Sequence, residues 1–390
     1  MALIGQVCTK GVWDETVPGI TFDENGVSNY AKIFQKLLDD FPRGEVGKKQ
    51  WLTTVEEIKK AGEGKTYDCI IGLSGGTDSS YLLHLAKEYD LRPLAVNLDN
   101  GWSSDIAVKN MKKMTSALNI DLETYVIDYQ EVIDVLSAYL RAKLPWADNP
   151  TDEAIRAILY KKAQQEKIKH ILIGHDFRTE GFQPTEWTYG DAKQLNYVAK
   201  KFSGRNIKSF PNLSIWKFGF LAFIKGIKMV KPFFYLPYNK GEVKLFLTQK
   251  YGWEDYGGHH YENIFTKFII SYWLVEKYGI DKRKITLSAL LLSGEVLRKD
   301  VLEELSKKPF DENQINKDID YILKKLNMTK EEFDNLFKGE KKYFYDYPSY
   351  YPLFGKFKKV IFPLMKYFLP NKPLMFYQME SRKKNHNNSN

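Results

Sequence analysis

Residues 67–79 read Tyr-Asp-Cys-Ile-Ile-Gly-Leu-Ser-Gly-Gly-Thr-Asp-Ser, and the class of fold follows from this segment. Its first half is a short apolar run, which is typical of a buried strand. Its second half, 74–79, is a glycine-rich turn, and the apolar residues 80–86 that follow are typical of a buried helix. This order predicts the first strand and the first helix of a parallel sheet.

The same alternation continues downstream. Further strands are expected at 93–98, 122–127 and 170–174, and further helices at 103–118, about 132–143 and about 151–167. Strands that alternate with helices in this way predict an α/β fold with a doubly wound parallel sheet. Beyond about Lys240 helical patterns dominate, at 242–251, 261–278, 286–292, 301–305 and 312–337.

A chain of 390 residues is longer than one compact core usually holds. We divide it into an N-terminal lead-in (1–65), a domain that carries the glycine-rich turn (66–205), a mostly helical unit (206–340) and a basic aromatic tail (341–390). The Asn-rich end of the tail is expected to be disordered.

The charge distribution and the cysteine content bear on the kind of substrate and on the compartment of the protein. The net charge of +9 is concentrated, with +8 in residues 341–390 and +1 in the remaining body. A second basic stretch runs from 192 to 241 and contains no Asp or Glu. A near-neutral body disfavours a long nucleic-acid substrate. Two cysteines, no recognisable signal peptide and four lysines within the apolar window 213–231 predict a cytoplasmic protein without a membrane span.

The turn at 74–79 has the chemistry of a phosphate site. Gly75 and Gly76 let the backbone approach phosphate oxygens, and the N–H groups of the following helix attract anions. The hydroxyls of Ser74 and Ser79 can donate hydrogen bonds to such oxygens. Asp78 would repel phosphate directly, but it suits a Mg²⁺ ion that bridges phosphates. The Gly-Lys-Ser/Thr ending of the Walker motif is missing.

Ser-Gly-Gly-x-Asp-Ser after a buried strand resembles the PP-loop of the N-type ATP pyrophosphatases. The resemblance implies that the chain splits ATP into AMP and pyrophosphate, and it implies ATP contacts along the whole turn, Thr77 included. It also implies an adenosine site at Leu98, Asp99 and Asn100. Gly174, His175 and Asp176 are similar to the Gly-His pattern that such enzymes place beside the α-phosphate.

A wider set of motifs resembles the N-acetyl sugar amidotransferases of surface-polysaccharide and flagellar-sugar pathways. The set covers roughly residues 5–340 and consists of segments beginning at Cys8, Tyr67, Pro150, Trp187, Lys208, Tyr256 and Asp281. The resemblance implies that an acetamido group of a sugar is adenylated on oxygen and converted by ammonia to an acetamidino group. No glutaminase nucleophile is recognisable in the chain, so a separate glutaminase subunit is expected to supply the ammonia.

This chemistry assigns roles to further residues. Mg²⁺ would be held by Asp78 and Asp176, and phosphate charge would be stabilised by His175 and Lys208. Candidates for the sugar site are Trp187, Tyr189, His259, His260 and Glu262. An aromatic cluster or helix caps are an alternative reading of the last group.

The N-terminal lead-in departs from the family pattern. Similar proteins typically open with two Cys-x-x-Cys pairs, which would form a tetrahedral zinc site. The matching positions here are Cys8, Gly11, Ser28 and Ala31. One thiolate without a nearby His cannot hold structural zinc, so no zinc is expected.

Other readings stay open at this point. If 213–231 is one helix, its four lysines fall within a sector of about 120°. That face and the tail could contact the inner surface of a membrane, cover an ordinary core or receive the glutaminase. Alternative functions are a tRNA-modifying PP-loop enzyme and a non-catalytic ATP-binding subunit of a glutaminase complex.

Overall fold

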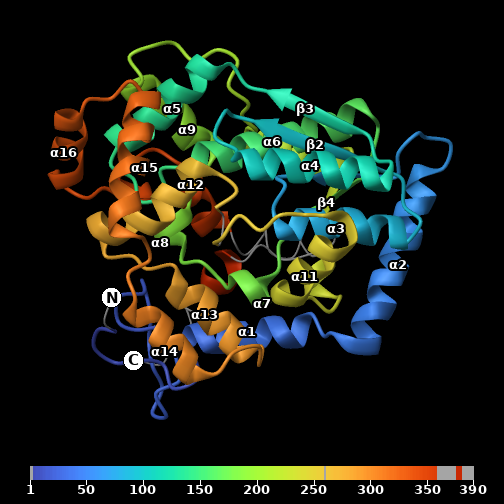
Figure 1. Cartoon of the computed structure of the whole chain (residues 1–390), viewed down its shortest axis with the longest axis horizontal. Coiled ribbons are helices and arrows are strands. Elements are labelled where there is room, and N and C mark those ends of the chain that lie inside the picture. The colour runs from blue at the N-terminus through green and yellow to red at the C-terminus, as the bar shows by residue number, and fades with distance from the viewer. Residues whose placement is uncertain (1–2, 259–260, 358–374, 380–390) are drawn as a thin grey trace.

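A computed structural model of the chain describes residues 3–258, 261–357 and 375–379 (Figure 1). Its centre is a five-stranded parallel sheet with the strand order β3-β2-β1-β4-β5. The strands are β1 (Cys69–Gly72), β2 (Pro93–Asp99), β3 (Leu122–Val126), β4 (His170–Leu172) and β5 (Lys228–Val230). The α/β fold with a doubly wound parallel sheet is thereby confirmed. Because the strand order reverses beside β1, the switch point between β1 and β4 is where such a sheet binds ligands.

Helices cover both faces of the sheet because neighbouring side chains of β1 point to opposite sides. Cys69 and Ile71 join one core, to which α2, α3, α4 and α11 also contribute. Ile70 joins a second core beneath α6. These helices are α2 (Gly44–Gly62), α3 (Thr77–Glu88), α4 (Asp105–Leu118), α6 (Asn149–Gln165) and α11 (Lys240–Tyr251).

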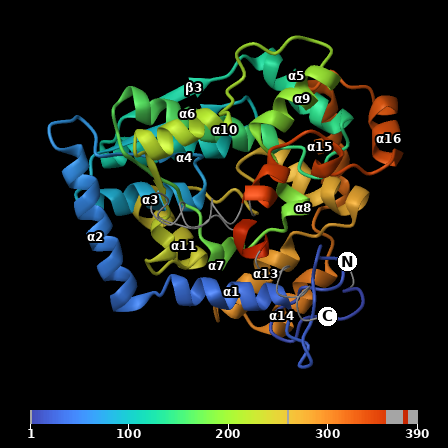
Figure 2. The ribbon, with the colours of Figure 1, turned by 180° about the vertical axis from the view of Figure 1, so that it is seen from behind.

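The fifth strand corrects the sequence analysis. Residues 213–231 do not form one helix: a short helix, α10 (Ile215–Gly219), continues as the π-helix η1 (Phe220–Ile224), and the chain then enters β5. Gly226 has a φ of +67°, a backbone conformation that ends a helix readily. Figure 2 shows α10 lying beside α6 on the rear of the molecule, where Phe218 meets Tyr160 with ring centroids 5.4 Å apart.

A larger core lies beside the sheet and consists mainly of helices (Figure 1). Its helices are α1 (Asn29–Asp40), α5 (Tyr129–Arg141), α7 (Phe177–Glu180), α8 (Thr185–Thr188), α9 (Ala192–Phe202), α12 (Ile264–Phe268), η3 (Ile269–Tyr278), α13 (Arg283–Leu292), α15 (Glu312–Lys325) and α16 (Lys330–Lys338). Smaller elements elsewhere are η2 (Pro232–Phe234), α14 (Arg298–Ser306) and η4 (Phe344–Asp346). The four-part division of the chain stays a prediction.

The helix expected at 312–337 is wrong, because the chain forms two helices there. Asn327 adopts a φ of +54°, which ends α15. Thr329 then caps α16 by accepting a hydrogen bond from the N–H of Glu332 at 3.1 Å. Asn near a helix end and Thr at a helix start are the signals that mark this break.

The lead-in folds against the helical core around the four positions where similar proteins carry cysteines. We call residues 8–31 the N-terminal knuckle. Its Cys8 sulfur accepts hydrogen bonds from the N–H groups of Gly11 (3.5 Å) and Ser28 (3.3 Å). The Ser28 hydroxyl accepts one from the N–H of Ala31 at 3.2 Å and so caps α1. The four positions therefore converge without the four thiolates.

Side chains of α13 and α14 hold the knuckle in place. Asp14 and Lys284 form a fully buried ion pair at 2.6 Å. The N–H of Val12 donates to the Ser288 hydroxyl at 2.8 Å, and Arg298 donates to the carbonyls of residues 8, 9 and 11.

Within the described part of the chain, no helix is both long and apolar enough to cross a bilayer.

Candidate functional site

The glycine-rich turn forms a tight loop between β1 and α3. Gly75 has a φ of +78°, and a Cβ atom built there would lie 2.2 Å from the carbonyl oxygen of Ala107. The Ser74 and Ser79 hydroxyls are 3.2 Å apart. The Ser74 hydroxyl also accepts the N–H of Gly76 at 3.2 Å. These contacts keep two hydroxyls together at the N-terminus of α3, where an anion is favoured.

Hydrogen bonds from residues 110 and 253–256, which are distant in the sequence, hold the glycine-rich turn in shape. No role was predicted for these residues from the sequence. The indole of Trp253 donates to the carbonyl of Gly75 at 3.2 Å, and the side chain of Asn110 bridges Gly75 and Glu254. The Tyr256 hydroxyl accepts the N–H of Thr77 at 3.2 Å. The conformation of the turn therefore depends on residues 253–256 as well as on its own glycines.

Asp78 has partners that its predicted role did not anticipate. One carboxylate oxygen accepts a hydrogen bond from the Tyr238 hydroxyl, and the other pairs with Lys240 at 3.0 Å. Burial lowers the pKa of Lys240, but the nearby Asp78 carboxylate outweighs this and raises it. A basic side chain thus lies at the phosphate turn without the lysine of a Walker motif.

The loop after β4 meets the turn at Gly174. A Cβ atom there would lie 2.9–3.0 Å from Asp78, so this contact requires glycine. The imidazole Nδ1 of His175 hydrogen-bonds to Glu180. Gly174 therefore lies beside the turn, and its place at the α-phosphate stays a prediction.

Asp176 has a structural role that differs from the one expected. Its side chain is fully buried, caps α7 by accepting the N–H of Arg178 at 3.2 Å, and pairs with Arg43 at 2.9 Å. Burial raises its pKa to about 7, against the opposing effect of Arg43. Because its carboxylate is enclosed by these partners, we do not retain Asp176 as a metal ligand or a catalytic group.

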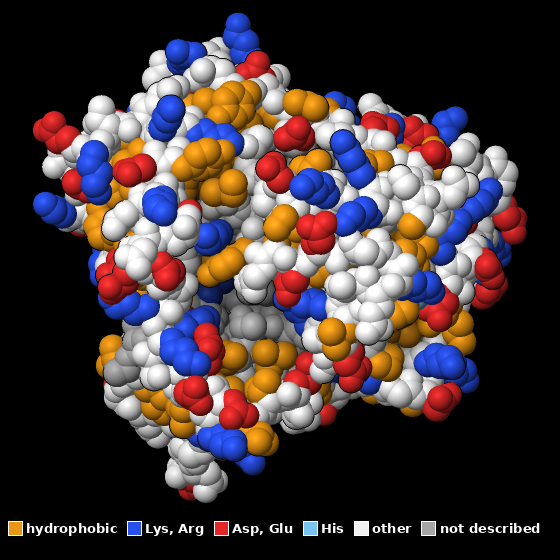
Figure 3. Space-filling view, viewed as in Figure 1, with side chains coloured by type: hydrophobic (Ala, Val, Ile, Leu, Met, Phe, Trp, Pro, Cys, Tyr) orange, Lys and Arg blue, Asp and Glu red, His pale blue; other side chains and the backbone are white. Residues whose placement is uncertain are grey.

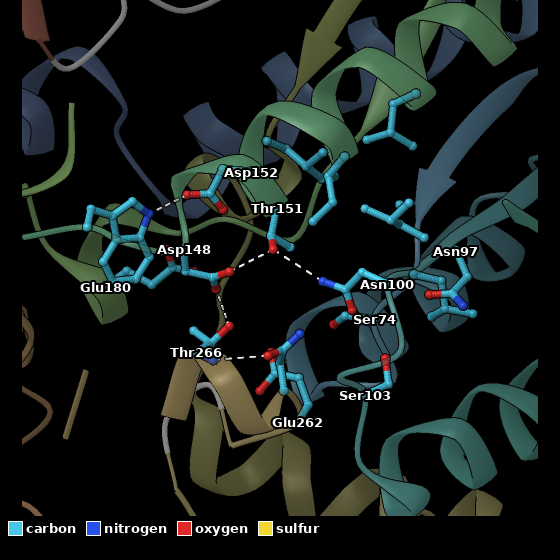
Figure 4. A pocket seen from close by; sticks show the side chains of 18 of the residues that line it. Ser74, Asn97, Asn100, Ser103, Asp148, Thr151, Asp152, Glu180, Glu262 and Thr266 are labelled. Carbon is cyan, nitrogen blue, oxygen red and sulfur yellow. Dashed lines mark hydrogen bonds between the residues drawn. The ribbon is translucent and has the colours of Figure 1, made fainter. Parts of the chain in front are cut away.

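A cavity of about 450 Å³ lies at the carboxyl ends of β1, β2 and β4, and we call it the first cavity. Its lining includes Ser74, Leu98, Asn100 and Glu262. Figure 4 shows one wall of it, where Asn100 donates to Thr151 at 3.2 Å and Thr151 donates to Asp148 at 2.6 Å. The first cavity therefore occupies the switch point at which a doubly wound sheet binds its ligand.

A second cavity of about 620 Å³ adjoins the first. Five residues line both cavities, namely Asp152, Glu180, Gln183, Thr188 and Lys282. The second cavity also has aromatic and apolar side chains from α6, α10 and the segment 350–354. Polar groups on an apolar, partly aromatic wall are typical of a site for a small organic ligand.

Lys282 lies in the shared wall, and the sequence analysis assigned it no role beyond its place in the motif at Asp281. Its amine lies 4.0 Å from the centroid of the Trp146 ring. Burial lowers its pKa to about 8, although nearby carboxylates, Asp152 foremost, oppose this. Burial likewise lowers the pKa of Lys231 to about 8, and Lys231 lines the second cavity. The expected surface lysine at 231 is therefore a cavity residue.

Glu153 is a buried acid in the lining of the second cavity. It is 1% exposed, and one oxygen pairs with Arg156 at 2.8 Å. Its Oε2 atom has no hydrogen-bond partner among the described residues. Burial raises the pKa of Glu153 to about 7. A buried polar atom without a partner calls for an explanation, and a ligand bound in the adjoining cavity is one.

The remaining predicted residues divide between the cavities and other places. Glu262 lies in the first cavity, because residues 262–264 pair with 102–104. Tyr189 lines the second cavity and donates to Asp191 at 2.6 Å. Asp99 accepts the N–H of Gly101 at 2.8 Å and is not among the described lining residues. His259 and His260 lie outside the described residues.

Two predictions are corrected by burial and position. Trp187 is 2% exposed and belongs to the helical core, so it is not available to a sugar. Lys208 is exposed in the loop after α9, where its backbone N–H donates to Glu131 at 2.7 Å. It is not among the described residues of either cavity, so a role at the phosphates is not retained.

A magnesium ion finds one suitable carboxylate at the turn. No group of three or more His, Cys, Asp or Glu side chains that could hold a metal exists in the described ranges. Mg²⁺ usually takes one or two carboxylates together with substrate phosphates and water. Asp78 fits that need if Lys240 turns to the phosphates, whereas Asp176 does not fit.

Comparisons with known proteins add an independent observation. Residues 262–361 match the model of a family described as LPS biosynthesis protein WbpG-like, C-terminal domain. The uncharacterized protein MJ1599 of Methanocaldococcus jannaschii is 32% identical over 139 residues, which are 35% of this chain and 47% of that protein. The match spans less than half the length of this relative.

Three solved structures are similar in part. They are the NH3-dependent NAD synthetase of Campylobacter jejuni (19% identity, 39% of this chain, 60% of that chain, TM-score 0.26), the U34-tRNA thiolase NcsA of Methanococcus maripaludis (15%, 77%, 89%, 0.32) and the NMN synthetase of Francisella tularensis (16%, 76%, 96%, 0.31). Because these TM-scores are low, no residue role is transferred from the three structures to this chain.

Proposed function

We propose that the protein is an ATP-dependent amidotransferase that converts an acetamido group of a sugar to an acetamidino group. The observation that carries the proposal is the glycine-rich turn at the carboxyl end of β1, whose Ser74 lines a cavity that shares five lining residues with a second one. The match of residues 262–361 to a lipopolysaccharide biosynthesis domain supports a sugar as the acceptor. The amidotransferase motifs of the sequence supply the reaction type.

The reaction has two steps that balance in atoms and charge. The amide oxygen attacks the α-phosphorus of ATP, the bond to the β-phosphate oxygen breaks, and pyrophosphate leaves. Ammonia then adds to the carbon of the resulting imidate, a proton is lost, and AMP departs with the former amide oxygen. Both steps depend mainly on positioning and on stabilising charge, because no covalent link to the protein is needed.

The residues of the chain divide this work between the two cavities. Ser74, which lines the first, would bind the β- and γ-phosphates together with Ser79 and the N-terminus of α3, with Asp78 and its partner Lys240 at the adjoining turn. In the second, Glu153 and Tyr189 would bind the sugar. Lys282, in the shared wall, would face the developing charge where the two ligands meet.

Ammonia is proposed to come from a separate glutaminase. A direct test incubates the purified chain with ATP, Mg²⁺, ammonium and a panel of acetamido sugars. The expected result is release of AMP together with a mass loss of about one dalton in the sugar, because oxygen is replaced by NH. Glutamine alone should not replace ammonium. ATP hydrolysis without a change in any sugar would contradict the proposal.

A tRNA substrate remains the rival that needs exclusion. Figure 3 shows Lys and Arg interspersed with Asp and Glu over the face it displays, and not gathered in one basic stripe. A tRNA-modifying enzyme should bind tRNA with an affinity that falls steeply with salt. Tight, salt-dependent binding of tRNA in a filter assay would favour this rival over the sugar.

A further inference from the structure

The helix formed by α10 and η1 exposes large apolar side chains that a globular protein normally buries. Trp216 is 81% exposed, Ile224 74% and Phe220 45%. These three residues follow one another at intervals of four, so they share one side of the helix. We call them, with Phe223, Lys217 and Lys225, the docking face.

The opposite side of this helix is firmly packed. Leu221 is fully buried in the core beneath α6, and Phe218 contacts Tyr160 with ring centroids 5.4 Å apart. Ser214 caps the helix by accepting the N–H of Lys217 at 3.3 Å. The helix is therefore a fixed part of the fold, and its outer side is exposed while its inner side contributes to the core.

The charged side chains of the docking face itself, Lys217 and Lys225, are both basic, and one acid, Glu57, pairs with the neighbouring Lys228 at 3.7 Å. Lys217 and Lys225 are exposed on the helix itself, and Lys228 follows in β5. No Asp or Glu occurs in the sequence from 192 to 241. A second copy of the chain that docked through the same face would bring these lysines against one another. An anionic surface that also accepts apolar side chains is the complementary partner.

We propose that the docking face binds the surface of an anionic lipid bilayer. Trp and Phe prefer the boundary between headgroups and acyl chains, and each lysine near anionic headgroups adds attraction. The contact would be peripheral, since no helix of the described ranges could span a membrane.

The position of the docking face links it to the second cavity. Ile215 and Phe218 of the same helix line that cavity, together with Tyr350 and Phe354. Leu353, Lys356 and Phe357 of the neighbouring segment are exposed as well. If the second cavity is the acceptor site proposed above, docking would bring its rim to the membrane and suit an acceptor sugar carried on a lipid.

Flotation with lipid vesicles tests the proposal on the full chain. We expect binding to vesicles of phosphatidylcholine mixed with phosphatidylglycerol and much weaker binding to phosphatidylcholine alone. The double variant Trp216→Ser/Ile224→Ser should bind at least about tenfold more weakly, and so should Lys217→Gln/Lys225→Gln. Raising the salt concentration should weaken the wild type.

A matched control removes exposed apolar residues elsewhere. Val126 is 68% exposed and Leu245 is 65% exposed, so Val126→Ser/Leu245→Ser should bind vesicles like the wild type. Absence of wild-type binding, equal binding to both lipids, or unchanged binding of the docking-face variants would each overturn the proposal. The assay contains neither ATP nor sugar, so its failure would leave the proposed reaction standing.

Discussion

The glycine-rich turn and the N-terminal knuckle are two tight backbone structures that differ in the polar side chains they carry. In the turn, the glycines that shape the loop and the hydroxyls and carboxylate that would act on a ligand are present together. In the knuckle, the four converging positions persist, but only Cys8 has a side chain that resembles a zinc ligand. The knuckle thus has a defined fold without a set of metal ligands.

The turn and the knuckle also differ in what holds each of them in shape. Zinc normally contributes directly to the folding of a small knuckle. In this chain protein contacts hold the knuckle, because the Asp14–Lys284 ion pair and the Arg298 hydrogen bonds attach it to α13 and α14. The turn is also held by protein contacts, from Trp253, Tyr256 and Lys240, but its Ser74 lines the first cavity. Changes in the turn should therefore affect activity, and changes in the knuckle should affect stability.

Gly75→Ala should have the largest effect. A methyl group would meet the Ala107 carbonyl oxygen at 2.2 Å in a backbone with a φ of +78°, so the turn cannot keep its shape. We expect loss of ATP binding and of AMP release to background, measured by calorimetry and by an AMP assay. Gly64→Ala is the matched control, since Gly64 has a φ of +71° with nothing within 4 Å, and it should cost about 1 kcal/mol of stability.

Asp78→Asn should have the next largest effect. The amide keeps the size of the side chain but removes the charge that pairs with Lys240 and would bind Mg²⁺. We expect AMP release to fall about a hundredfold with little change in thermal stability. Asp105→Asn, at the exposed first turn of α4, serves as the control. A normal rate in Asp78→Asn would refute the assignment.

Asp14→Asn should lower the stability of the protein through the knuckle without changing the activity that depends on the turn. It leaves Lys284 buried without its partner, which typically costs about 3–5 kcal/mol. Denaturant unfolding should show this loss, while AMP release per folded molecule stays normal. An equal loss of specific activity would show that the knuckle acts on the site.

The same ion pair gives a pH dependence. Burial raises the pKa of Asp14, but hydrogen bonds from Lys284, Thr16 and Ile4 outweigh it and hold the pKa below 3.8. The unfolded chain therefore binds this proton more readily than the folded chain does. The stabilisation is present above about pH 3.8 and is lost as the pH falls through the folded-state pKa. The free energy of unfolding of Asp14→Asn should lack this component in an acid titration.

Gly11→Cys should have the smallest effect. Its Cβ atom would lie 2.5 Å from the Trp13 ring, so returning one ligand to the knuckle means overpacking it. We expect a loss of about 1–3 kcal/mol and no bound zinc by elemental analysis. Ala31→Cys, at another of the four positions, is the comparison. Stable zinc binding by Gly11→Cys would show that the knuckle still tolerates its metal.

The turn and the sheet could be predicted because their signals are local. A buried strand, two glycines and a helix follow one another in the chain. A glycine at position 75 by itself indicates a backbone with a positive φ. Asn100 and Gly174 could be placed for the same reason, since they directly follow strands that end at one edge of the sheet.

The rest depends on contacts between distant residues. Nothing near Asp78 in the sequence indicates that Tyr238 and Lys240 approach it from about 160 residues away. Trp187 and Asp176 were expected at the site because their residue types suit sugars and metals, but burial decides their roles. The strand at 228–230 was missed because its three residues follow a helix with strong amphipathic spacing.

The shared wall of the two cavities has a thermodynamic consequence. A ligand in one cavity that shifts the side chain of Lys282 or Thr188 changes the surface that a ligand in the other cavity contacts. Linkage then requires reciprocity: whatever factor the nucleotide applies to the affinity for the acceptor, the acceptor must apply to the affinity for the nucleotide. Measuring one factor by titration therefore fixes the other.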